Sequence, residues 1–261
     1  MLSASIAIQN NIVFVWLWSG FLMILNASSE PLVVNIANKG GDVLQETFDA
    51  NVTDDTIKLS FKQFDGTSIN HLIDFPTAMQ GFHLLLPPTT NKGQMNKQEF
   101  CFIVPLGSEE YISSDAISKL RQKNPHTVRR PEEELPPQSF YMQATFSSVS
   151  VSHAFPLCRR TLVQTFFLIP EESLAARNTT LPTKFEGIPA CDIALGLSGQ
   201  PCVCSYNLCI VWYPCGLKFC QTTQPNGEIV SYRCGIKTCK KCRQFLFVAQ
   251  NRLDCPPEFY V

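Results

Sequence analysis

Apolar and polar residues alternate along much of the first part of the chain, which is the pattern of strands with one buried face. The clearest case is residues 56–64, where Ile57, Leu59 and Phe61 alternate with lysine and serine. The dipeptide Asp65-Gly66, typical of tight hairpin turns, follows it, and residues 69–75 supply the partner strand. Further strands are predicted at residues 32–37, 43–48, 100–105, 141–151 and 162–169. The pattern therefore predicts a sheet, with residues 100–105, wholly apolar, as a central strand.

One segment, residues 113–125, breaks this period and is predicted to be a helix. It opens with an N-cap serine and an acidic first turn, continues with basic residues, and ends at Pro125. Its buried stripe would consist of Ala116, Ile117 and Leu120. The basic residues that continue to Arg130 are better explained by a helix C-terminus followed by glutamates than by a nucleic-acid surface. Residues 127–138, with three prolines and three glutamates, are predicted to be a solvated linker.

The N-terminus carries an apolar run, residues 12–25, of 14 residues. This run is shorter than the about 20 residues that a membrane helix needs. Small residues follow it, so residues 1–29 are predicted to be a signal peptide cleaved near Ser29. The alternative is a signal anchor that stays in the membrane, lengthened by Ile6 and Ile8. We expect removal, which makes the mature chain secreted and extracellular, without stable membrane insertion.

Twelve cysteines, an even number, divide the chain unevenly. Cys101 and Cys158 precede residue 190, and the other ten follow it: Cys191, Cys202, Cys204, Cys209, Cys215, Cys220, Cys234, Cys239, Cys242 and Cys255. In the oxidising secretory pathway this composition predicts a disulfide framework. We therefore expect two parts after the signal peptide: residues 30–185, held mainly by a hydrophobic core, and residues 190–261, held mainly by cross-links.

Two closely spaced cysteine pairs raise other chemistry. Cys202-x-Cys204 and Cys239-x-x-Cys242 have spacings found in zinc sites, but no histidine lies beyond His153, and zinc thiolates belong to reducing compartments. The second pair, with two lysines inside it, also resembles a redox motif, yet no βαβ pattern surrounds it. We expect neither a metal nor a cofactor, and disulfides instead.

Charge and histidine context argue against nucleic-acid binding and hydrolysis. The formal net charge is -1, which gives no attraction to nucleic acid. His71, His83 and His153 lack a Gly-x-Ser-x-Gly elbow or a comparable nucleophile, so we expect a protein that is not an enzyme. The triplets that begin at Asn51 and Asn178 are N-glycosylation sequons, and both are predicted to be occupied.

Two stretches carry a resemblance to a known family. The first is AISKLRQKNPHTVRRPEEE, residues 116–134, and the second is QPCVCSYNLCIVWYPCGLKFC, residues 200–220, continued by YRCGIKTCKKC at residues 232–242. Together they closely resemble the out at first family, secreted proteins named from a developmental locus. The resemblance implies a secreted, disulfide-rich glycoprotein with a developmental role. It would act as a non-enzymatic extracellular interaction protein, with another extracellular protein, not identified by the sequence, as partner.

A second likeness lies in the first part of the chain. HLIDF with Asp74, EFCFIVPL with Cys101, the helix, and Cys158 before an apolar run follow the order of a BRICHOS domain. This resemblance implies an α+β fold for residues 30–185, a BRICHOS-like antiparallel sheet flanked by helices, followed by a small disulfide-rich C-terminal module. It also implies that Cys101 pairs with Cys158, and it raises an alternative function, chaperone-like capping of β-prone client segments.

The same resemblance makes Asp74 the BRICHOS-type aspartate. From its position on a strand, the side chain is either a buried carboxyl, whose pKa burial would raise, or a hydrogen-bonded residue without a switch role.

The out at first resemblance also bears on pairing in the C-terminal block. Eight of its cysteines match the family pattern, whereas Cys209 and Cys242 are additions. Two additions in one module are most simply explained by a bond between them. The alternatives are that one of them replaces a family partner, or that both are free.

Overall fold

The computed structural model describes residues 30–37, 43–88, 98–107, 110–144, 156–158, 164–168, 185–191, 200–250 and 252–256. Residues 31–261 form one compact unit. The predicted signal peptide, residues 1–29, lies outside the described residues, as does the sequon asparagine Asn178. Within the described part of the chain, no helix has the length and apolar character needed to cross a membrane.

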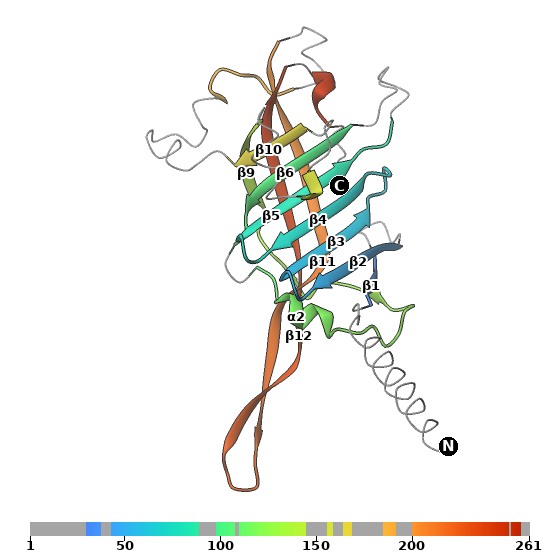
Figure 1. Ribbon diagram of the computed structural model, residues 1–261, viewed down its shortest axis with the longest axis vertical. Helices are drawn as coiled ribbons and strands as arrows, with labels where there is room; N and C mark the ends of the chain where they lie inside the picture. The colour runs from blue at the N-terminus through green and yellow to red at the C-terminus, as the bar shows by residue number, and fades with distance from the viewer. Residues whose placement is uncertain are drawn as a thin grey trace, which may run out of the picture. The chain divides into compact units, whose positions relative to one another are not determined.

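The sheet is built on a meander of six strands, in which neighbours along the chain pair antiparallel from β1 to β6. These strands are β1 (Leu32–Ala37), β2 (Val43–Asn51), β3 (Thr56–Lys62), β4 (Ser68–Asp74), β5 (Met79–Leu85) and β6 (Glu99–Pro105). Beyond β6 the sheet continues with β10 (Gln164–Leu168), parallel to β6, and β9 (Gln138–Ala144), antiparallel to β10. At the other edge, β7 (Val128–Arg129) lies parallel to β1. Figure 1 shows the main strands of this sheet as one layer.

The connection between β3 and β4 is the hairpin turn predicted from Asp65-Gly66. The carboxylate of Asp65 accepts hydrogen bonds from the backbone N–H and the hydroxyl of Thr67, at 2.8 and 2.5 Å. Gly66 has a φ of 84°, in the left-handed region that glycine adopts without steric cost. The alternating apolar residues of β3 are buried, as its sequence predicts: Ile57, Leu59 and Phe61. The predicted hairpin is therefore confirmed.

The cysteine-rich segment forms one long hairpin, of β11 (Cys202–Thr223) and β12 (Ile229–Ala249). β12 pairs in parallel with β9, and the inner half of the hairpin crosses one face of the sheet (Figure 1). Phe245 of β12 stacks on Phe102 of β6, with 4.4 Å between ring centroids. Trp212 of β11 meets Phe48 of β2 edge-on at 5.8 Å. A single cluster of buried side chains joins the hairpin to the sheet.

β6 is buried on both faces, which explains its uninterrupted apolar sequence. Three of its side chains belong to the core shared with the hairpin: Phe100, Phe102 and Val104. Cys101 and Ile103 point to the opposite face and pack with Cys158, which lies in the short 3-10 helix η2 (Pro156–Cys158). β6 lies between β5 and β10, so its predicted central position is confirmed.

The fold class implied by the BRICHOS resemblance is wrong. It requires an α+β sheet flanked by helices, whereas the described chain is mostly strand, and its only α-helix is α2 (Ser114–Ser118), of five residues. A second 3-10 turn, η5 (Arg252–Asp254), lies near the C-terminus. The cover that helices were expected to provide comes from β11 and β12. The disulfide-rich C-terminal region is a long hairpin that shares its core with the sheet.

α2 begins where the sequence predicts but ends earlier. The hydroxyl of Ser113 caps it by accepting the backbone N–H of Ala116 at 3.3 Å. The helix stops after Ser118, and the guanidinium of Arg121 donates to the carbonyls of Ser118 and Leu120. These bonds satisfy carbonyls that a longer helix would use internally, so the chain leaves the helix after little more than one turn.

Candidate interaction site: a disulfide-clamped hairpin

All twelve cysteines of the chain are paired in the structure. The bonds are Cys101–Cys158, Cys191–Cys202, Cys204–Cys255, Cys209–Cys242, Cys215–Cys239 and Cys220–Cys234. Both pairs expected from the sequence are among them. The two closely spaced cysteine pairs considered for zinc or redox chemistry are each split between different disulfides.

Three of these bonds cross-link β11 to β12 at successive positions. Cys209 lies directly opposite Cys242 in the antiparallel register, with 4.0 Å between the Cα atoms. Cys215–Cys239 follows beside a β-bulge, and Cys220–Cys234 lies nearest the turn. A two-stranded ribbon is at best marginally stable in water by itself. The outermost of them, Cys220–Cys234, therefore stabilises the part of the hairpin that the sheet does not cover.

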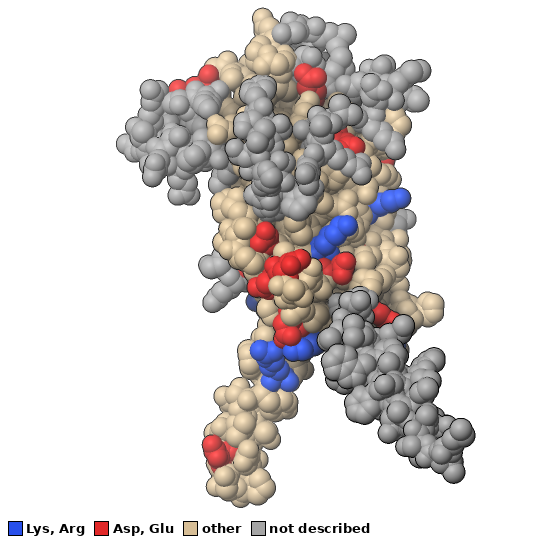
Figure 2. All heavy atoms as spheres, viewed as in Figure 1, with Lys and Arg blue, Asp and Glu red and all other residues tan. Residues whose placement is uncertain are grey.

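The outer part of the hairpin, residues 218–235, is here called the arm. Within the described residues its strands pair only with each other, and Figure 1 shows it projecting beyond the sheet. Three large apolar side chains on it are exposed: Phe219 by 61%, Ile229 by 65% and Tyr232 by 50%. By strand register, Phe219 and Ile229 share one face and Tyr232 lies on the other. The arm surface is otherwise mostly uncharged (Figure 2), a combination found at protein-binding surfaces.

The tip of the arm is a turn of defined geometry. The carbonyl of Gln224 accepts the N–H of Gly227 at 2.9 Å, and the carbonyl of Glu228 accepts the N–H of Gln224 at 2.8 Å. The carboxamide oxygen of Asn226 accepts the N–H of Glu228 at 3.0 Å, and Gly227 has a φ of 83°. This is a type I turn followed by a glycine bulge, a common three-residue hairpin loop. The local sequence Pro225-Asn226-Gly227 therefore encodes the tip.

Removing the outermost cross-link should loosen the arm without unfolding the rest of the chain. In the double variant Cys220→Ser/Cys234→Ser, we expect the free energy of global unfolding to fall by less than about 1 kcal/mol, because the arm lies outside the buried core. Amide hydrogen exchange within residues 218–235 should become at least about tenfold faster, since the arm opens locally. Hydrogen–deuterium exchange with mass spectrometry measures the second effect, and denaturant unfolding measures the first.

The matched control removes a buried disulfide instead. Cys101→Ser/Cys158→Ser should lower the free energy of global unfolding by about 2 to 5 kcal/mol. An equal global loss from the arm variant, or unchanged exchange within the arm, would contradict the independence of the arm.

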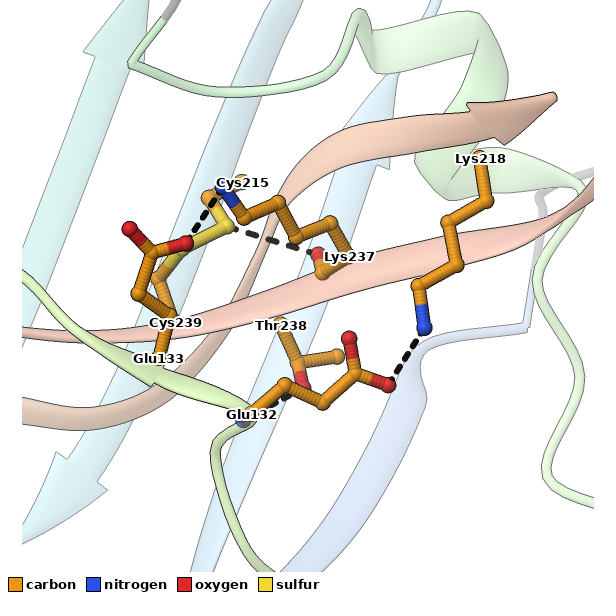
Figure 3. Close-up of a disulfide and its surroundings, with 7 residues drawn as sticks. All are labelled: Glu132, Glu133, Cys215, Lys218, Lys237, Thr238 and Cys239. Carbon is orange, nitrogen blue, oxygen red and sulfur yellow. Dashed lines mark hydrogen bonds and ion pairs between the residues drawn. A yellow bond between two sulfur atoms is a disulfide. The ribbon is translucent and has the colours of Figure 1, made fainter.

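At the base of the arm, three consecutive glutamates pair with three lysines of the hairpin. The ion pairs are Glu132–Lys218, Glu133–Lys237 and Glu134–Lys240, of which Figure 3 shows the first two. Their segment is not the solvated linker that its composition predicts, since β8 (Glu133–Glu134) runs parallel to β12. The backbone N–H groups of Glu132 and Leu135 donate to the carbonyls of Thr238 and Lys240 at 3.0 and 2.9 Å. Exposed ion pairs are individually weak, so this third strand orients the base of the arm more than it stabilises the chain.

The inner half of the hairpin carries a buried ionic cluster. Arg243 of β12 is 1% exposed, and its guanidinium donates to a carboxylate oxygen of Glu110. Lys241 donates to the same oxygen at 2.9 Å. The other oxygen of Glu110 accepts from the carboxamide of Gln80 at 3.1 Å and from the backbone N–H of Gly107 at 3.2 Å. Burial by itself raises the pKa of Glu110, but the two cations outweigh it and the pKa is lowered.

Two ring side chains complete this cluster. The hydroxyl of Tyr111 accepts from Arg243 at 2.9 Å. His71 stacks on the ring of Phe82 at 4.1 Å, and its Nε2 bonds to the carboxamide oxygen of Gln80 at 3.1 Å. Because that oxygen can only accept, Nε2 carries the proton. Burial, with Arg243 adding to it, lowers the pKa of His71 well below its ordinary value, so this histidine is a neutral member of the core.

A second buried carboxyl, Glu46 of β2, faces the β-bulge of β11. The register shift between Ile210 and Tyr213 brings the backbone amides of Val211 and Trp212 near it. Neither carboxyl oxygen makes a hydrogen bond of ordinary geometry, although these amides counteract part of the effect of burial. Burial dominates and raises the pKa of Glu46 to about 8. At neutral pH this side chain is therefore mostly protonated.

Two other residues singled out in the sequence lie at strand ends. Asp74 ends β4, half-buried, and its carboxylate accepts the N–H of Thr77 at 3.1 Å, which is the hydrogen-bonded arrangement rather than a buried carboxyl. Asn51 is exposed at the end of β2, and its carboxamide oxygen accepts the N–H groups of Thr53 and Asp54. Asn51 is thus accessible to glycosylation, and its occupancy stays a prediction.

The sequence of the chain matches two models of one protein family and two proteins of that family. The family model described as "Out at first" matches residues 30–166, and that described as "Out at first, C-terminal" matches residues 191–258. The out at first protein of Drosophila virilis is 33% identical over an alignment of 265 residues, gaps included. The match covers 93% of this chain and 87% of the relative. The protein of the same name in Drosophila melanogaster is 31% identical over 259 residues. Here the match covers 89% of this chain but 53% of the relative.

No solved structure matches the chain. The two family models nevertheless include the arm, its base and the buried ionic cluster between them, because the matched ranges contain all of these residues. With these matches and the two relatives, the family expected from the sequence motifs is confirmed, and the chain belongs to the out at first family.

Proposed function

We propose that this chain is a secreted, non-enzymatic extracellular interaction protein with a role in development, and that the arm contacts its protein partner. The observation that carries this proposal is the arm itself, a cross-linked ribbon with Phe219, Ile229 and Tyr232 exposed. Cross-linking before binding reduces the ordering entropy that a flexible loop would lose in a complex. The six disulfides suit an oxidising extracellular environment.

Two of the histidines considered for hydrolysis support a non-enzymatic role. His71 is fully buried and engaged with Gln80 and Phe82. His83 is 8% exposed, with its Nε2 3.4 Å from a carboxylate oxygen of Glu99. Neither histidine is therefore an exposed residue. Chaperone-like capping of β-prone segments is not proposed, because the helix-flanked BRICHOS-like fold on which it rested is contradicted by the strand content of the chain.

Site-specific photocross-linking tests the arm as the contact surface. A photoreactive benzoylphenylalanine at Phe219, in protein secreted from eukaryotic cells and applied to intact tissue, should cross-link an extracellular protein that mass spectrometry identifies repeatedly. Phe64 is the matched control, an aromatic residue exposed by 56% in the connection between β3 and β4, and the same group there should not capture that protein. Equal capture from both positions would contradict the proposal.

Binding measurements on the same tissue provide a second test of this contact surface. The variant Phe219→Ser/Ile229→Ser should weaken binding at least about tenfold, as loss of a central apolar contact does, whereas Phe64→Ser should leave it unchanged.

Sequencing the N-terminus of the secreted protein tests removal of residues 1–29. Protein confined to membranes and starting at Met1 would contradict secretion.

A further inference from the structure

Two disulfides come together where β11 begins. Cys202 and Cys204 are separated by one residue, so both side chains lie on the same buried face of the strand. They belong to different bonds, one to Cys191 and one to Cys255. The sulfur of Cys191 lies 3.8 Å from that of Cys204, and the sulfurs of Cys191, Cys202 and Cys255 all lie within 4.8 Å of one another. The four sulfurs therefore form one cluster.

The backbone register accounts for this proximity. Ala190 bridges to Val203 in parallel, and the N–H of Cys191 donates to the carbonyl of Val203 at 2.9 Å. Cys191 thus lies beside the segment that carries both Cys202 and Cys204. Its sulfur is bonded to the first and in van der Waals contact with the second, so either is within reach of the same side chain.

We propose that this cluster is a thiol-exchange site, at which an external thiol converts the pairs Cys191–Cys202 and Cys204–Cys255 into Cys191–Cys204 and Cys202–Cys255. The substrate is a thiolate, from a small molecule or from another protein. It attacks Sγ of Cys255, a half-buried residue, forms a mixed disulfide there, and expels Cys204 as a thiolate. This proposal does not depend on the function proposed for the arm.

The remaining steps regenerate the external thiol. The Cys204 thiolate attacks Sγ of Cys191 across the 3.8 Å gap, which forms Cys191–Cys204 and expels the Cys202 thiolate. The Cys202 thiolate then attacks Sγ of Cys255 in the mixed disulfide, which forms Cys202–Cys255 and releases the external thiolate. Two protein disulfides exist before and after, so the exchange involves no net oxidation or reduction.

The cross-links of the arm offer a contrast. Cys220–Cys234 is separated from Cys215–Cys239 by five residues along each strand, which corresponds to about 16 Å. A thiolate formed at Cys234 therefore has no neighbouring disulfide within reach. The comparison predicts exchange at the start of β11 and none on the arm.

Single-cysteine variants of the full secreted chain test this contrast. Cys202→Ser leaves Cys191 as a thiol, and attack by its thiolate on Cys204–Cys255 moves the free thiol to Cys255. Alkylation followed by peptide mapping should find label at both Cys191 and Cys255. Label at Cys191 alone would overturn the proposal.

Cys220→Ser is the matched control, and here the label should stay at Cys234 alone. Label spread beyond Cys234 would also overturn the proposal, because exchange would then not require the sulfur cluster. If Cys202→Ser is not secreted, Cys255→Ser replaces it. That variant frees Cys204, whose attack on Cys191–Cys202 should move the label to Cys202.

The unaltered chain provides a test that needs no variant. It is incubated with reduced glutathione, quenched in acid and digested without reduction, and linked peptides are fragmented to separate Cys202 from Cys204. We expect both new pairs, a glutathione adduct at Cys255, and the other four disulfides unchanged. Original pairs only, or adducts distributed evenly over all six disulfides, would overturn the proposal.

Discussion

Replacing Glu110 by leucine should lower the free energy of unfolding by about 3 to 5 kcal/mol, because Arg243 would remain buried without its counter-charge. Arg243 is 1% exposed and donates to the Glu110 carboxylate, which also accepts from Lys241 at 2.9 Å. The guanidinium cannot shed its proton, and Tyr111 alone does not neutralise it. Denaturant unfolding with the disulfides intact measures the loss.

Two further variants separate buried charge from simple loss of an ion pair. Glu132→Leu breaks an exposed pair with Lys218 and should cost less than about 1 kcal/mol. Glu110→Leu/Arg243→Met removes both members of the buried pair and should be more stable than Glu110→Leu alone, since the fully buried guanidinium no longer remains without its counter-charge. A double variant that is less stable than Glu110→Leu would show that Arg243 stabilises the fold by packing rather than through Glu110.

Replacing Glu46 by glutamine should stabilise the chain by about 2 to 4 kcal/mol at about pH 9 and have little effect at about pH 5. Burial raises the pKa of Glu46 from 4.5 to about 8, so the folded state retains a proton that the unfolded state releases. The stability of the unaltered chain is therefore fully present below about pH 4.5 and declines as the pH rises through about 8. Glutamine is neutral throughout and avoids this decline.

The control for this comparison is on the same strand. Asp49 of β2 is exposed, and Asp49→Asn should change the free energy of unfolding by less than about 1 kcal/mol at both pH values. Unfolding curves of the unaltered chain and of both variants, at the two pH values, give the four changes in the free energy of unfolding that the comparison needs. If Glu46→Gln stabilises the chain, relative to the unaltered protein, no more at high pH than at low pH, Glu46 ionises normally in the folded chain.

Five of the six meander strands were predictable because their information is local, whereas β5 was not predicted. In β3, period-two alternation selects the buried face, and Asp65-Gly66 sets the turn through a carboxylate and a glycine φ. The outer hairpin has the same kind of signal, since Asn226-Gly227 lies between two long strands. The density of cysteines instead favoured a small module over a long hairpin that spans the sheet.

The prediction that helices flank the sheet was wrong for a different reason. The helix beginning at Ser113 has a real N-cap, but carbonyls near its end bind Arg121 and the chain turns away after Ser118. One apolar face of the sheet still has to be covered, and β11 and β12 do this with rings such as Phe245 and Phe247. Which element covers a sheet depends on contacts between distant segments, which a motif of a few residues does not specify.

By itself, the sequence determined the family of this protein, the strands of its meander except β5, and the expectation that its cysteines form disulfides, because each of these follows from local pattern or composition. The tertiary structure decided which surfaces meet. Glu110 and Arg243 are 133 residues apart and form an ion pair only because the hairpin crosses the sheet. Cys204 likewise meets Cys255, 51 residues away, beside a second disulfide only because the chain returns to the start of β11. Such contacts depend on the packing of whole elements, and this is why the anchored base of the arm and the sulfur cluster emerge only from the folded chain.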